Sequence, residues 1–571
     1  MIIVGIFCEH DACAAVFDDY RMISAVAQER MSRIKGDGHG HPGAAVDECL
    51  AAANLSRSDV EVVAMTLGFY PARYFRSAQS DSVGDRSLLN EMRRARIRDP
   101  SAVFDWRRYL ADHGFSAGTK CFFYNHHIAH VLGALFHTDW DSGIGYSFDG
   151  SGDRQFFSAY RIDGGRVVPV AGGEWLALSP FRLQPTHASV ATLYLHVTRI
   201  LGFKPLRHEG KVLGLAAFGK PRFANLMAKH FKVDLAGRVW AIGSINPLVR
   251  KIEKLARCEP REDIAASVQQ ATERVILKAA DRLMRRAPSR RLAVAGGLFA
   301  NVKLNQLLAE KLGLDEFFAY PAMSDQGQAA GGILQYLLQR DGSETWLASR
   351  QKFETLYFGR DYESAIDRTL ESHGAAPIDG QDPALAAAQL IERGAAVATF
   401  LERAEYGPRA LGARSIIASA RRREINASLN KRLDRSDFMP FAPYVRAERA
   451  NDLFDLPTSL TYAANFMTTT CAVRREWRER VPAIVHVDGT ARPQIIYRRQ
   501  NPIYYDVLHR YEELTGEAAL INTSFNAHEE PIINTPAECA RALVDSRVDA
   551  VLTPTAIWRM PNRMLAPNST A

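Results

Sequence analysis

The sequence lacks the cysteine pattern of a disulfide-stabilised or zinc-ribbon protein. Its seven cysteines are scattered, and no two of them are separated by only two residues. An odd number of scattered cysteines argues against a disulfide framework and against a structural zinc site. We therefore expect a protein of a reducing compartment, and the cytoplasm is the predicted location.

Long apolar runs and a strong charge imbalance are also absent. No stretch reaches the roughly 18 apolar residues of a membrane-spanning helix, and the N-terminus MIIVGIFCEHDACAAVFDD lacks the basic region of a signal peptide. The chain has 71 Lys and Arg against 64 Asp and Glu. This small excess favours affinity for small anions, so we predict neither a membrane nor a nucleic acid as a partner.

The chain is long and apolar enough to form several cores. Its 571 residues are 47% hydrophobic, so two or three domains are expected. Three short strands are predicted within residues 2–29, followed by a helix over 40–56 and a strand over 60–67. A second strand-rich region that begins near Gly143 again leads into helices. This repeated order predicts an α/β fold built from duplicated RNase H-like units, as in actin-like ATPases, with a cleft between its halves.

The character of the sequence changes after about residue 335. We predict a first domain over 1–345, a connector over 346–384, and a second α/β domain over 385–571, where Arg and Pro are more frequent.

Two histidines have a spacing that could serve a metal ion. His126 and His130 stand at positions i and i+4 and would share one face of a helix. Histidine pairs on helices are more often structural, so the spacing alone leaves both readings open. Asp149 and Asp325 each follow an apolar strand, where a carboxylate could join the site or serve as a turn or cap residue. Two imidazoles and two carboxylates would suit Fe(II), Mn(II) or Zn(II).

Several short glycine motifs are candidates for phosphate or nucleotide contacts in the first domain. Glycine lets a ligand lie close to the backbone, and Asn301 could bond a ribose or a base. The alternative is an ordinary helix-entry turn. The glycines concerned are Gly150, Gly152, Gly296 and Gly297. Lys211 could meet a phosphate as a point charge, although an exposed loop lysine is the alternative.

Cationic and small polar residues are denser in the second domain. Arginine suits phosphate because its planar fork can bond two oxygens at once. Together the residues predict a pocket for a triphosphate and a carbonyl group, although one or two of the arginines are expected to form structural ion pairs instead. The residues are Arg409, Arg414, Lys431, Arg432, His486, Arg492, Asn522, Ser524 and Asn526.

Taken together, these motifs resemble one family along nearly the whole chain. In chain order they are HHIAH, SFDGSGD, EGKVLGLAAFG, AGGLFANVKLN, SDQGQAAGG, EYGPRALGARSI, PFAPYV, HVDGTARPQ and NTSFN. The sequence is similar to the O-carbamoyltransferases of the NodU/CmcH family, which serve antibiotic and nodulation-factor biosynthesis. Each motif is weak alone, and their common order makes the resemblance specific.

The resemblance implies an actin-like domain related to the tRNA threonylcarbamoyltransferases, followed by a YrdC-like domain. The YrdC-like domain would use ATP with Mg²⁺ and carbamoyl phosphate as co-substrate, and would form carbamoyladenylate and pyrophosphate. The first domain would transfer the carbamoyl group to a hydroxyl of a small-molecule acceptor, a natural product or a sugar. The resemblance makes a homodimer plausible, and no pattern in the sequence indicates an oligomeric state.

Residue roles follow from the matched motifs. The resemblance implies that His126, His130, Asp149 and Asp325 bind a divalent ion, iron by analogy, with His127 as the neighbour that does not. The residues of the second-domain pocket would bind ATP and carbamoyl phosphate. His10 and Asp11 would border the acceptor site and are candidates for the base, and Lys211 joins them as a catalytic candidate.

Three positions depart from the family pattern, and two other functions remain as alternatives. Ala413 and Met439 stand where other residues are common in the adenylating pocket, and Cys13 replaces a small Ser or Ala. One alternative is a hydrogenase-maturation-type carbamoyltransferase, although the zinc-finger cysteines of that type are missing here. The other is an actin-like nucleotide-binding module without turnover. The acceptor is not predicted.

Overall fold

The computed structural model describes residues 1–38, 40–77, 84–172, 188–378, 380–434 and 440–561. The chain forms two compact units. The first contains Met1–Gln28 and Gly36–Lys352, and the second contains Glu29–Lys35 and Phe353–Ala571. The segment 346–384, predicted as a connector, therefore divides between the two units. A short piece of the N-terminal sequence also belongs to the second unit, which the sequence did not predict.

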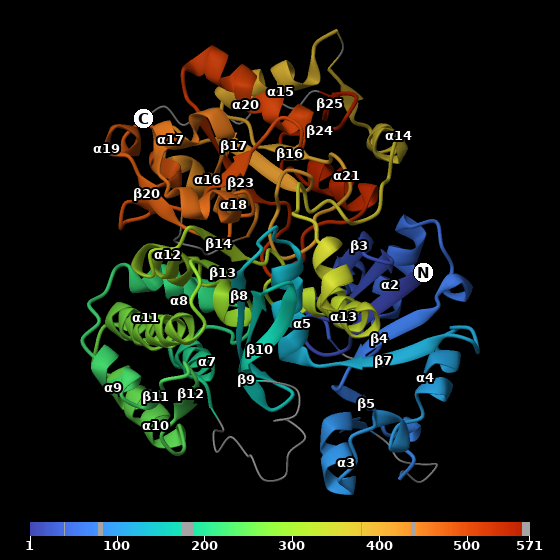
Figure 1. Cartoon of the computed structure of the whole chain (residues 1–571). Coiled ribbons are helices and arrows are strands. Elements are labelled where there is room, and N and C mark those ends of the chain that lie inside the picture. Colours follow the sequence, from blue (N-terminus) through green and yellow to red (C-terminus); the bar gives the residue numbers. More distant parts are fainter. Residues whose placement is uncertain (39, 78–83, 173–187, 379, 435–439, 562–571) are drawn as a thin grey trace. The chain divides into compact units, whose positions relative to one another are not determined.

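The first unit contains two five-stranded sheets with the same topology (Figure 1). In each sheet three consecutive strands pair antiparallel, and the first of them also pairs parallel to the fourth strand, beside which the fifth lies parallel. One sheet has the order β3 (Arg21–Ala27), β2 (Cys13–Asp18), β1 (Ile2–Phe7), β4 (Val62–Thr66) and β7 (Lys120–Tyr124). The other has the order β10 (Arg166–Ala171), β9 (Gln155–Asp163), β8 (Gly143–Gly152), β13 (Arg291–Ala295) and β14 (Glu316–Ala319). The duplicated RNase H-like, actin-like α/β fold is thus confirmed.

Two helices connect the halves of the first unit. Helix α5 (His126–Phe136) follows β7 but packs on strands of the other sheet, β8, β9 and β13. Helix α13 (Gln328–Ala348) follows β14 and packs on β1, β2 and β4. The two helices also pack against each other. As a result, the N-terminal ends of both helices meet near the end of β8, and the candidate ligands stand there.

The crossing of α5 and α13 is close because a glycine stands at the contact. A Cβ atom at Gly331 would lie 2.1 Å from the carbonyl oxygen of Ala129. We expect Gly331→Ala to lower the free energy of unfolding by about 1–3 kcal/mol, because the backbones must separate within a packed core. Urea unfolding checks this. Gly210→Ala, at a glycine of helix α8 (Glu209–Ala216) with open space at its Cβ position, is the matched control for backbone effects alone. An equal loss in both variants would contradict the packing explanation.

The remaining helices of the first unit cover the outer faces of its sheets. The longest of them is α11 (Arg261–Arg286), and the helix predicted over 40–56 is α2 (Gly43–Ala52). The others are α3 (Leu88–Ala95), α4 (Trp106–Asp112), α7 (Val190–Ile200), α8 (Glu209–Ala216), α9 (Ala224–Ala228), α10 (Asn246–Leu255) and α12 (Val302–Lys311). Two small ribbons complete it, β5 (Phe69–Pro71) with β6 (Asp85–Ser87) and β11 (Phe231–Val233) with β12 (Val239–Ala241).

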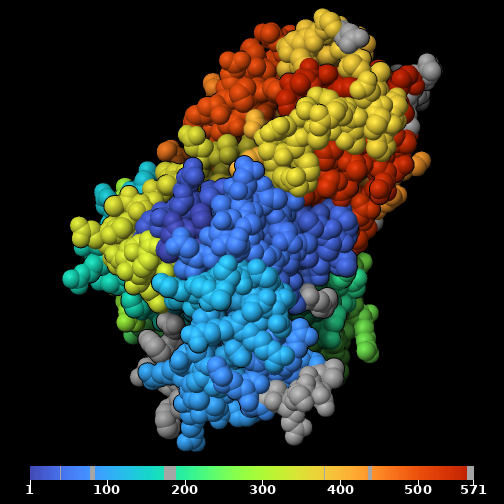
Figure 2. Space-filling view, turned by 90° about the vertical axis from the view of Figure 1, so that its right-hand side faces the viewer, coloured from blue at the N-terminus to red at the C-terminus, as the bar shows by residue number. Residues whose placement is uncertain are grey.

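The second unit is built on one eight-stranded mixed sheet. Its order is β15 (Ala376–Pro377), β25 (Ile557–Arg559), β24 (Ala550–Leu552), β16 (Val397–Thr399), β17 (Ser415–Ser419), β23 (Ala519–Ser524), β18 (Ala442–Arg446) and β22 (Gln494–Ile496). Pairing of β15 with β25 brings residues 376–377 beside the last strand of this unit, and Figure 2 shows yellow and red segments of the unit together on one face.

Both faces of this sheet are buried. Neighbouring residues of a strand point to opposite sides of a sheet, so the two faces can be followed along a single strand. Along β17, Ile416 and Ala418 join one core cluster, and Ile417 joins the other. Helices α15 (Pro383–Glu392) and α20 (Pro502–Thr515) cover the Ile417 side, and α14 (Ala365–Ser372), α16 (Glu424–Arg432) and α21 (Pro536–Val544) contribute to the other. Within the described residues, no helix is both long enough and apolar enough to cross a bilayer.

Candidate metal centre and anion site

The start of helix α5 is fixed by two side chains. Asn125 caps the helix by accepting a hydrogen bond from the Ile128 amide at 3.1 Å. The amide of His126 donates to Asp153 Oδ2 at 2.6 Å. His126 also requires a glycine beside it, because a Cβ at Gly152 would lie 2.1 Å from its ring carbon Cδ2. These contacts fix the direction in which His126 and His130 leave the helix.

Asp149 is held by the glycines predicted as phosphate contacts. It lies near the end of β8, where its Oδ1 accepts from the Gly150 amide at 2.6 Å and its Oδ2 accepts from the Gly297 amide at 3.0 Å. These two amides therefore orient a carboxylate. Gly296, at a φ of 102°, makes the turn possible, since a Cβ there would lie 2.3 Å from the carbonyl oxygen of Phe148.

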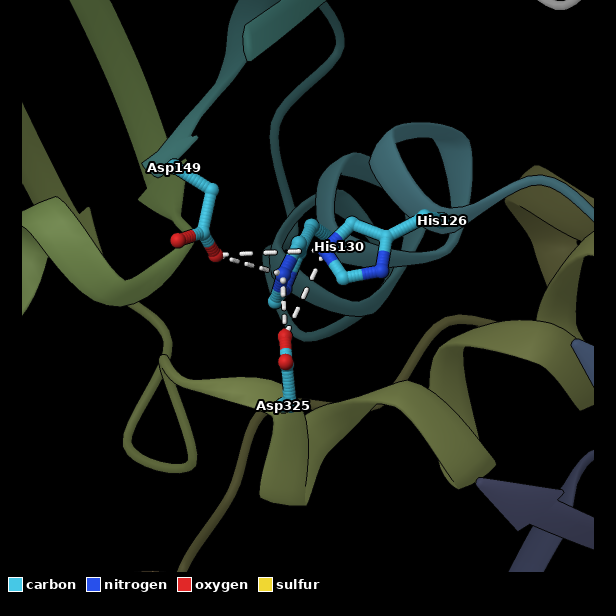
Figure 3. A group of neighbouring side chains, drawn as sticks. All are labelled: His126, His130, Asp149 and Asp325. Atoms are coloured by element: carbon cyan, nitrogen blue, oxygen red, sulfur yellow. Dashed lines mark ion pairs between the residues drawn. The ribbon is translucent and has the colours of Figure 1, made fainter. Parts of the chain in front are cut away.

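Four side chains from these elements converge (Figure 3). His130 Nε2 lies 3.4 Å from Asp149 Oδ2 and 3.3 Å from Asp325 Oδ1. His126 Nε2 lies 3.9 Å and 3.4 Å from the same two oxygens. One potential ligand atom from each residue lies within 4.8 Å of all the others. The structure thus brings together the four residues to which the sequence resemblance assigns a metal ion.

The chemistry of this group fits a divalent ion. The side chains of His130 and Asp325 are only 0% and 4% exposed. Nε2 of both histidines and Oδ1 of Asp325 are buried without a hydrogen-bond partner, although such atoms are normally satisfied. Two imidazole nitrogens and two carboxylate oxygens are the donor set of a borderline divalent ion. The residues therefore fit the predicted metal.

Without an ion, the charges of the group stabilise one another. Burial disfavours a charged imidazole, but Asp325 and Asp149 raise the pKa of His126 to about 9. Against its burial, the two imidazoles hold the pKa of Asp149 well below its usual range. Carboxylates that remain ionised in the interior are ready to accept a cation.

His127 differs from its two neighbours, because both of its ring nitrogens have partners. Nδ1 lies 3.1 Å from Ser147 Oγ and Nε2 lies 3.0 Å from the Gln155 carbonyl. Burial and the charge of His126 lower the pKa of His127 to about 3. It is therefore a neutral core residue of the helix.

His10 lies at the metal group, whereas Asp11 forms an ion pair with an arginine. His10 Nε2 is 3.2 Å from Asp325 Oδ2, and its side chain is 41% exposed. Asp11 is paired with Arg207, whose Nη1 lies 3.2 Å from Asp11 Oδ1. Arg207 also donates to the Gly36 carbonyl at 2.8 Å. This arginine, which the sequence argument missed, thus ties down the turn that carries His10.

The other first-unit candidates take different places. Asn301 caps α12 by accepting from the Leu304 amide, and its Nδ2 donates to Gln269 Oε1 at 2.7 Å, so its amide is occupied inside the protein. Lys211 stands on helix α8 and not in the loop that its glycines predicted. Cys13 lies in β2, where its thiol donates to the Asp325 carbonyl at 3.5 Å. A residue much larger than Cys would displace Asp325.

In the second unit, Glu405 closes the loop 405–414. Its Oε1 accepts hydrogen bonds from the amides of Leu411, Ala413 and Arg414 at 2.7, 2.8 and 3.1 Å. Asn522 supports the same loop, because its Nδ2 donates to the Ala410 carbonyl at 3.0 Å.

The support continues through one further amide. Asn522 Nδ2 also donates to Gln494 Oε1 at 2.7 Å, and Gln494 Nε2 donates to the Leu411 carbonyl at 2.7 Å. Asn522 was predicted to contact a ligand, and its Nδ2 instead braces the loop.

Two arginines at this loop lack a carboxylate partner. Within the described part of the chain, neither Arg409 nor Arg492 forms an ion pair, and Nε of each is buried without a hydrogen-bond partner. Burial lowers the pKa of both, and the charge of Arg409 lowers that of Arg492 further. Two neighbouring cations without an acid between them are unfavourable unless an anion binds there. This pair is the centre of the candidate anion site.

The other basic candidates divide by partner. Arg432 forms two hydrogen bonds to Asp549, at 2.7 and 2.8 Å, so it is one of the structural ion pairs expected among these arginines. Arg414 is fully buried; its Nη1 donates to the carbonyls of Leu401 and Glu402, while its Nε and Nη2 have no partner. Lys431 is exposed on α16.

Three polar candidates are partly satisfied by the protein. His486 Nδ1 lies 3.3 Å from Asp488, while its Nε2 is buried without a hydrogen-bond partner. Ser524 donates to Asn526 Oδ1 at 2.5 Å, and Asn526 donates to the carbonyl of Glu530 at 2.7 Å. Met439 lies outside the described residues.

Glu405 was missed from the sequence, although it opens the motif EYGPRALGARSI. Glu405→Gln is expected to lower the free energy of unfolding by about 1–3 kcal/mol, because three buried amides then face a neutral and weaker acceptor. Denaturant unfolding measures the loss. Glu371→Gln, at an exposed position on α14, is the matched control. Unchanged stability in Glu405→Gln would contradict this role.

Asp153 was also missed, and its signal lay in the sequence as the last residue of SFDGSGD. The Gln494 and Arg207 contacts join residues 83 and 196 positions apart, so no local pattern could have indicated them.

The fold and this pair of sites define a two-unit enzyme, and comparison with known proteins supplies its family. The sequence matches the families described as "Carbamoyltransferase N-terminus" over residues 2–334 and "Carbamoyltransferase C-terminus" over residues 388–559. The chain belongs to the carbamoyltransferase family. The resemblance predicted from its motifs is confirmed.

Individual relatives cover most of the chain. Nodulation protein NolNO of Sinorhizobium fredii is 31% identical over 95% of this chain and 78% of its own length. Nodulation protein U of the same species is 25% identical over 98% of this chain and 100% of its own length. Among solved structures, HypF of T. kodakarensis has a TM-score of 0.34 at 12% identity, covering 61% of this chain and 49% of that one.

Proposed function

We propose that this carbamoyltransferase acts on a hydroxyl of a small-molecule acceptor and uses ATP, carbamoyl phosphate and a divalent ion, with iron as the first candidate. The observation that carries the proposal is the buried group His126, His130, Asp149 and Asp325, whose ligand atoms lie within 4.8 Å of one another. Family membership supplies the carbamoyl group as the unit transferred.

The second unit would form carbamoyladenylate. Water breaks the carbamoyl–phosphate bond and phosphate leaves. The resulting carbamate oxygen attacks the α-phosphorus of ATP, and pyrophosphate leaves. Arg409 and Arg492 suit the phosphate groups, because both are cationic and have no acid partner.

The first unit would complete the transfer. The acceptor oxygen attacks the carbamoyl carbon, the bond to AMP breaks, and AMP leaves. His10 would take the hydroxyl proton, because its side chain is partly exposed and its Nε2 lies 3.2 Å from Asp325 Oδ2, beside the proposed metal ligands. A divalent ion bound by the four ligands would supply a Lewis acid that polarises the carbamoyl carbonyl or holds the phosphate of AMP.

The first experiment measures pyrophosphate and phosphate released from ATP and carbamoyl phosphate, without an acceptor. Pyrophosphate release that depends on carbamoyl phosphate supports adenylation. Release of neither product by folded protein supplied with Mg²⁺ and Fe(II) would contradict adenylation independent of the acceptor. Phosphate without pyrophosphate would reduce the second unit to hydrolysis of carbamoyl phosphate.

A further inference from the structure

A short N-terminal segment is built into the second unit. Residues Glu29–Lys35, which include helix α1 (Glu29–Ser32), belong to it although the chain on both sides belongs to the first unit. The segment is anchored firmly. Arg33 Nε lies 2.5 Å from Glu538 Oε1, and its Nη1 and Nη2 donate to the carbonyls of Ile532 and Pro531 at 2.9 and 2.8 Å.

Another arginine of the segment reaches the loop of the anion site. Arg30 is 4% exposed, and its Nη2 donates to the Gly407 carbonyl at 3.0 Å. Gly407 stands two residues before Arg409, inside the loop that Glu405 closes. Its φ of 100° is a conformation that only glycine adopts readily, so the carbonyl has an unusual direction and Arg30 is its donor.

The surroundings of Arg30 are not those of a structural ion pair. In the described residues no carboxylate lies within ion-pair distance of its guanidinium, and its Nη1 is buried without a hydrogen-bond partner. Burying an arginine without a paired acid is costly. Proteins commonly retain a buried charged group of this kind where it serves a functional site.

We propose that Arg30 is a positioning residue of the adenylating site, which holds loop 405–414 in the shape that presents Arg409 to the phosphates of ATP. This inference rests on the proposed function of the second unit. It makes an N-terminal residue a part of the C-terminal active site. The single hydrogen bond to Gly407 is the contact through which it acts.

Arg33 provides a matched control. Both arginines lie on the same segment and both donate to backbone carbonyls of the second unit, but Arg33 contacts residues 531–538 and not the loop. Substitution of Arg33 therefore tests the anchoring of the segment, whereas substitution of Arg30 tests the support of loop 405–414.

The test measures carbamoyl phosphate-dependent pyrophosphate release in the full-length chain as a function of ATP concentration. We expect Arg30→Ala to raise the KM for ATP about tenfold or more, as loss of a hydrogen bond from a charged group does. Arg30→Lys, which keeps the charge and one donor, should recover part of the loss. Arg33→Ala should lower the thermal unfolding temperature, while its KM for ATP stays within about twofold of the wild-type value. A change of that size is smaller than the effect of losing one hydrogen bond from a charged group.

Two results would overturn the inference. One is a KM in Arg30→Ala equal to that of the wild type. The other is the same rise in KM in Arg33→Ala, which would assign the effect to the segment as a whole. If Arg30→Ala does not fold, Arg30→Lys decides by the same comparison, since an unchanged KM at a weaker donor contradicts the role. Absence of pyrophosphate release from the wild type would instead refute the proposed function.

Discussion

A double variant with His126→Ala and His130→Ala is expected to bind a divalent ion far more weakly than the wild type. In the proposed site these side chains would supply two of the four ligand atoms, and Nε2 of each is buried without a hydrogen-bond partner. Mutation of residues that only hydrogen-bond to metal ligands already lowers metal affinity about 10–100-fold. Removal of two ligands should therefore lower it by more than about 100-fold. Metal analysis of the purified protein and calorimetric titration with Fe(II) measure this.

The same variant should keep the activity of the second unit. Pyrophosphate release that depends on carbamoyl phosphate should continue near its wild-type rate, because the arginines proposed to bind ATP lie in the other compact unit. His127→Ala is the matched control on the same helix: it should lower stability by removing the contacts of a buried ring, yet retain the metal. A double variant that still binds Fe(II) with wild-type affinity would refute the ligand set.

The second large effect is expected at Arg492. Arg492→Ala should raise the KM for ATP about 10–100-fold, which corresponds to one or two hydrogen bonds from a charged group. Unliganded Arg492→Ala should also unfold at an equal or higher temperature than the wild type. The reason is that the substitution removes an unpaired cation beside Arg409. Steady-state kinetics and calorimetric melting measure the two effects.

Weaker ATP binding together with unchanged or higher stability would identify Arg492 as a binding residue, since loss of a structural residue would lower stability. Arg498→Ala, which removes an exposed arginine paired with Asp506, is the control and should change neither quantity by much. An Arg492→Ala protein with wild-type KM would mean that the site does not use this cation for ATP.

The features predicted correctly from the sequence are those that a local pattern of residues encodes. The strand order within residues 2–67 and its repetition after Gly143 indicated the duplicated fold. The i, i+4 spacing placed His126 and His130 on one helical face. Which basic residues stay unpaired could not be read in this way. Arg432 and Arg492 look alike in the sequence, and only the fold brings Asp549 to one and another arginine to the other.

Glycine motifs were also ambiguous from sequence alone. The turns at Gly150 and at Gly297 each resemble a phosphate-binding loop. Binding a phosphate and binding a carboxylate both require backbone amides that are free to donate. In the structure these amides bind the carboxylate of Asp149, which comes from a strand paired with the one before Gly297. A contact between residues 148 positions apart leaves no trace in a local window.

The discontinuous second unit has a consequence for biosynthesis. Its first piece, Glu29–Lys35, leaves the ribosome early, and the sheet that receives it begins only after Phe353. At a synthesis rate of about 5–20 residues per second, this piece must wait roughly 15–60 s for its partner strands. A gene cut once, between the two family regions, would therefore yield a C-terminal product that lacks one of its own parts, and supplying residues 29–35 in trans is the natural remedy.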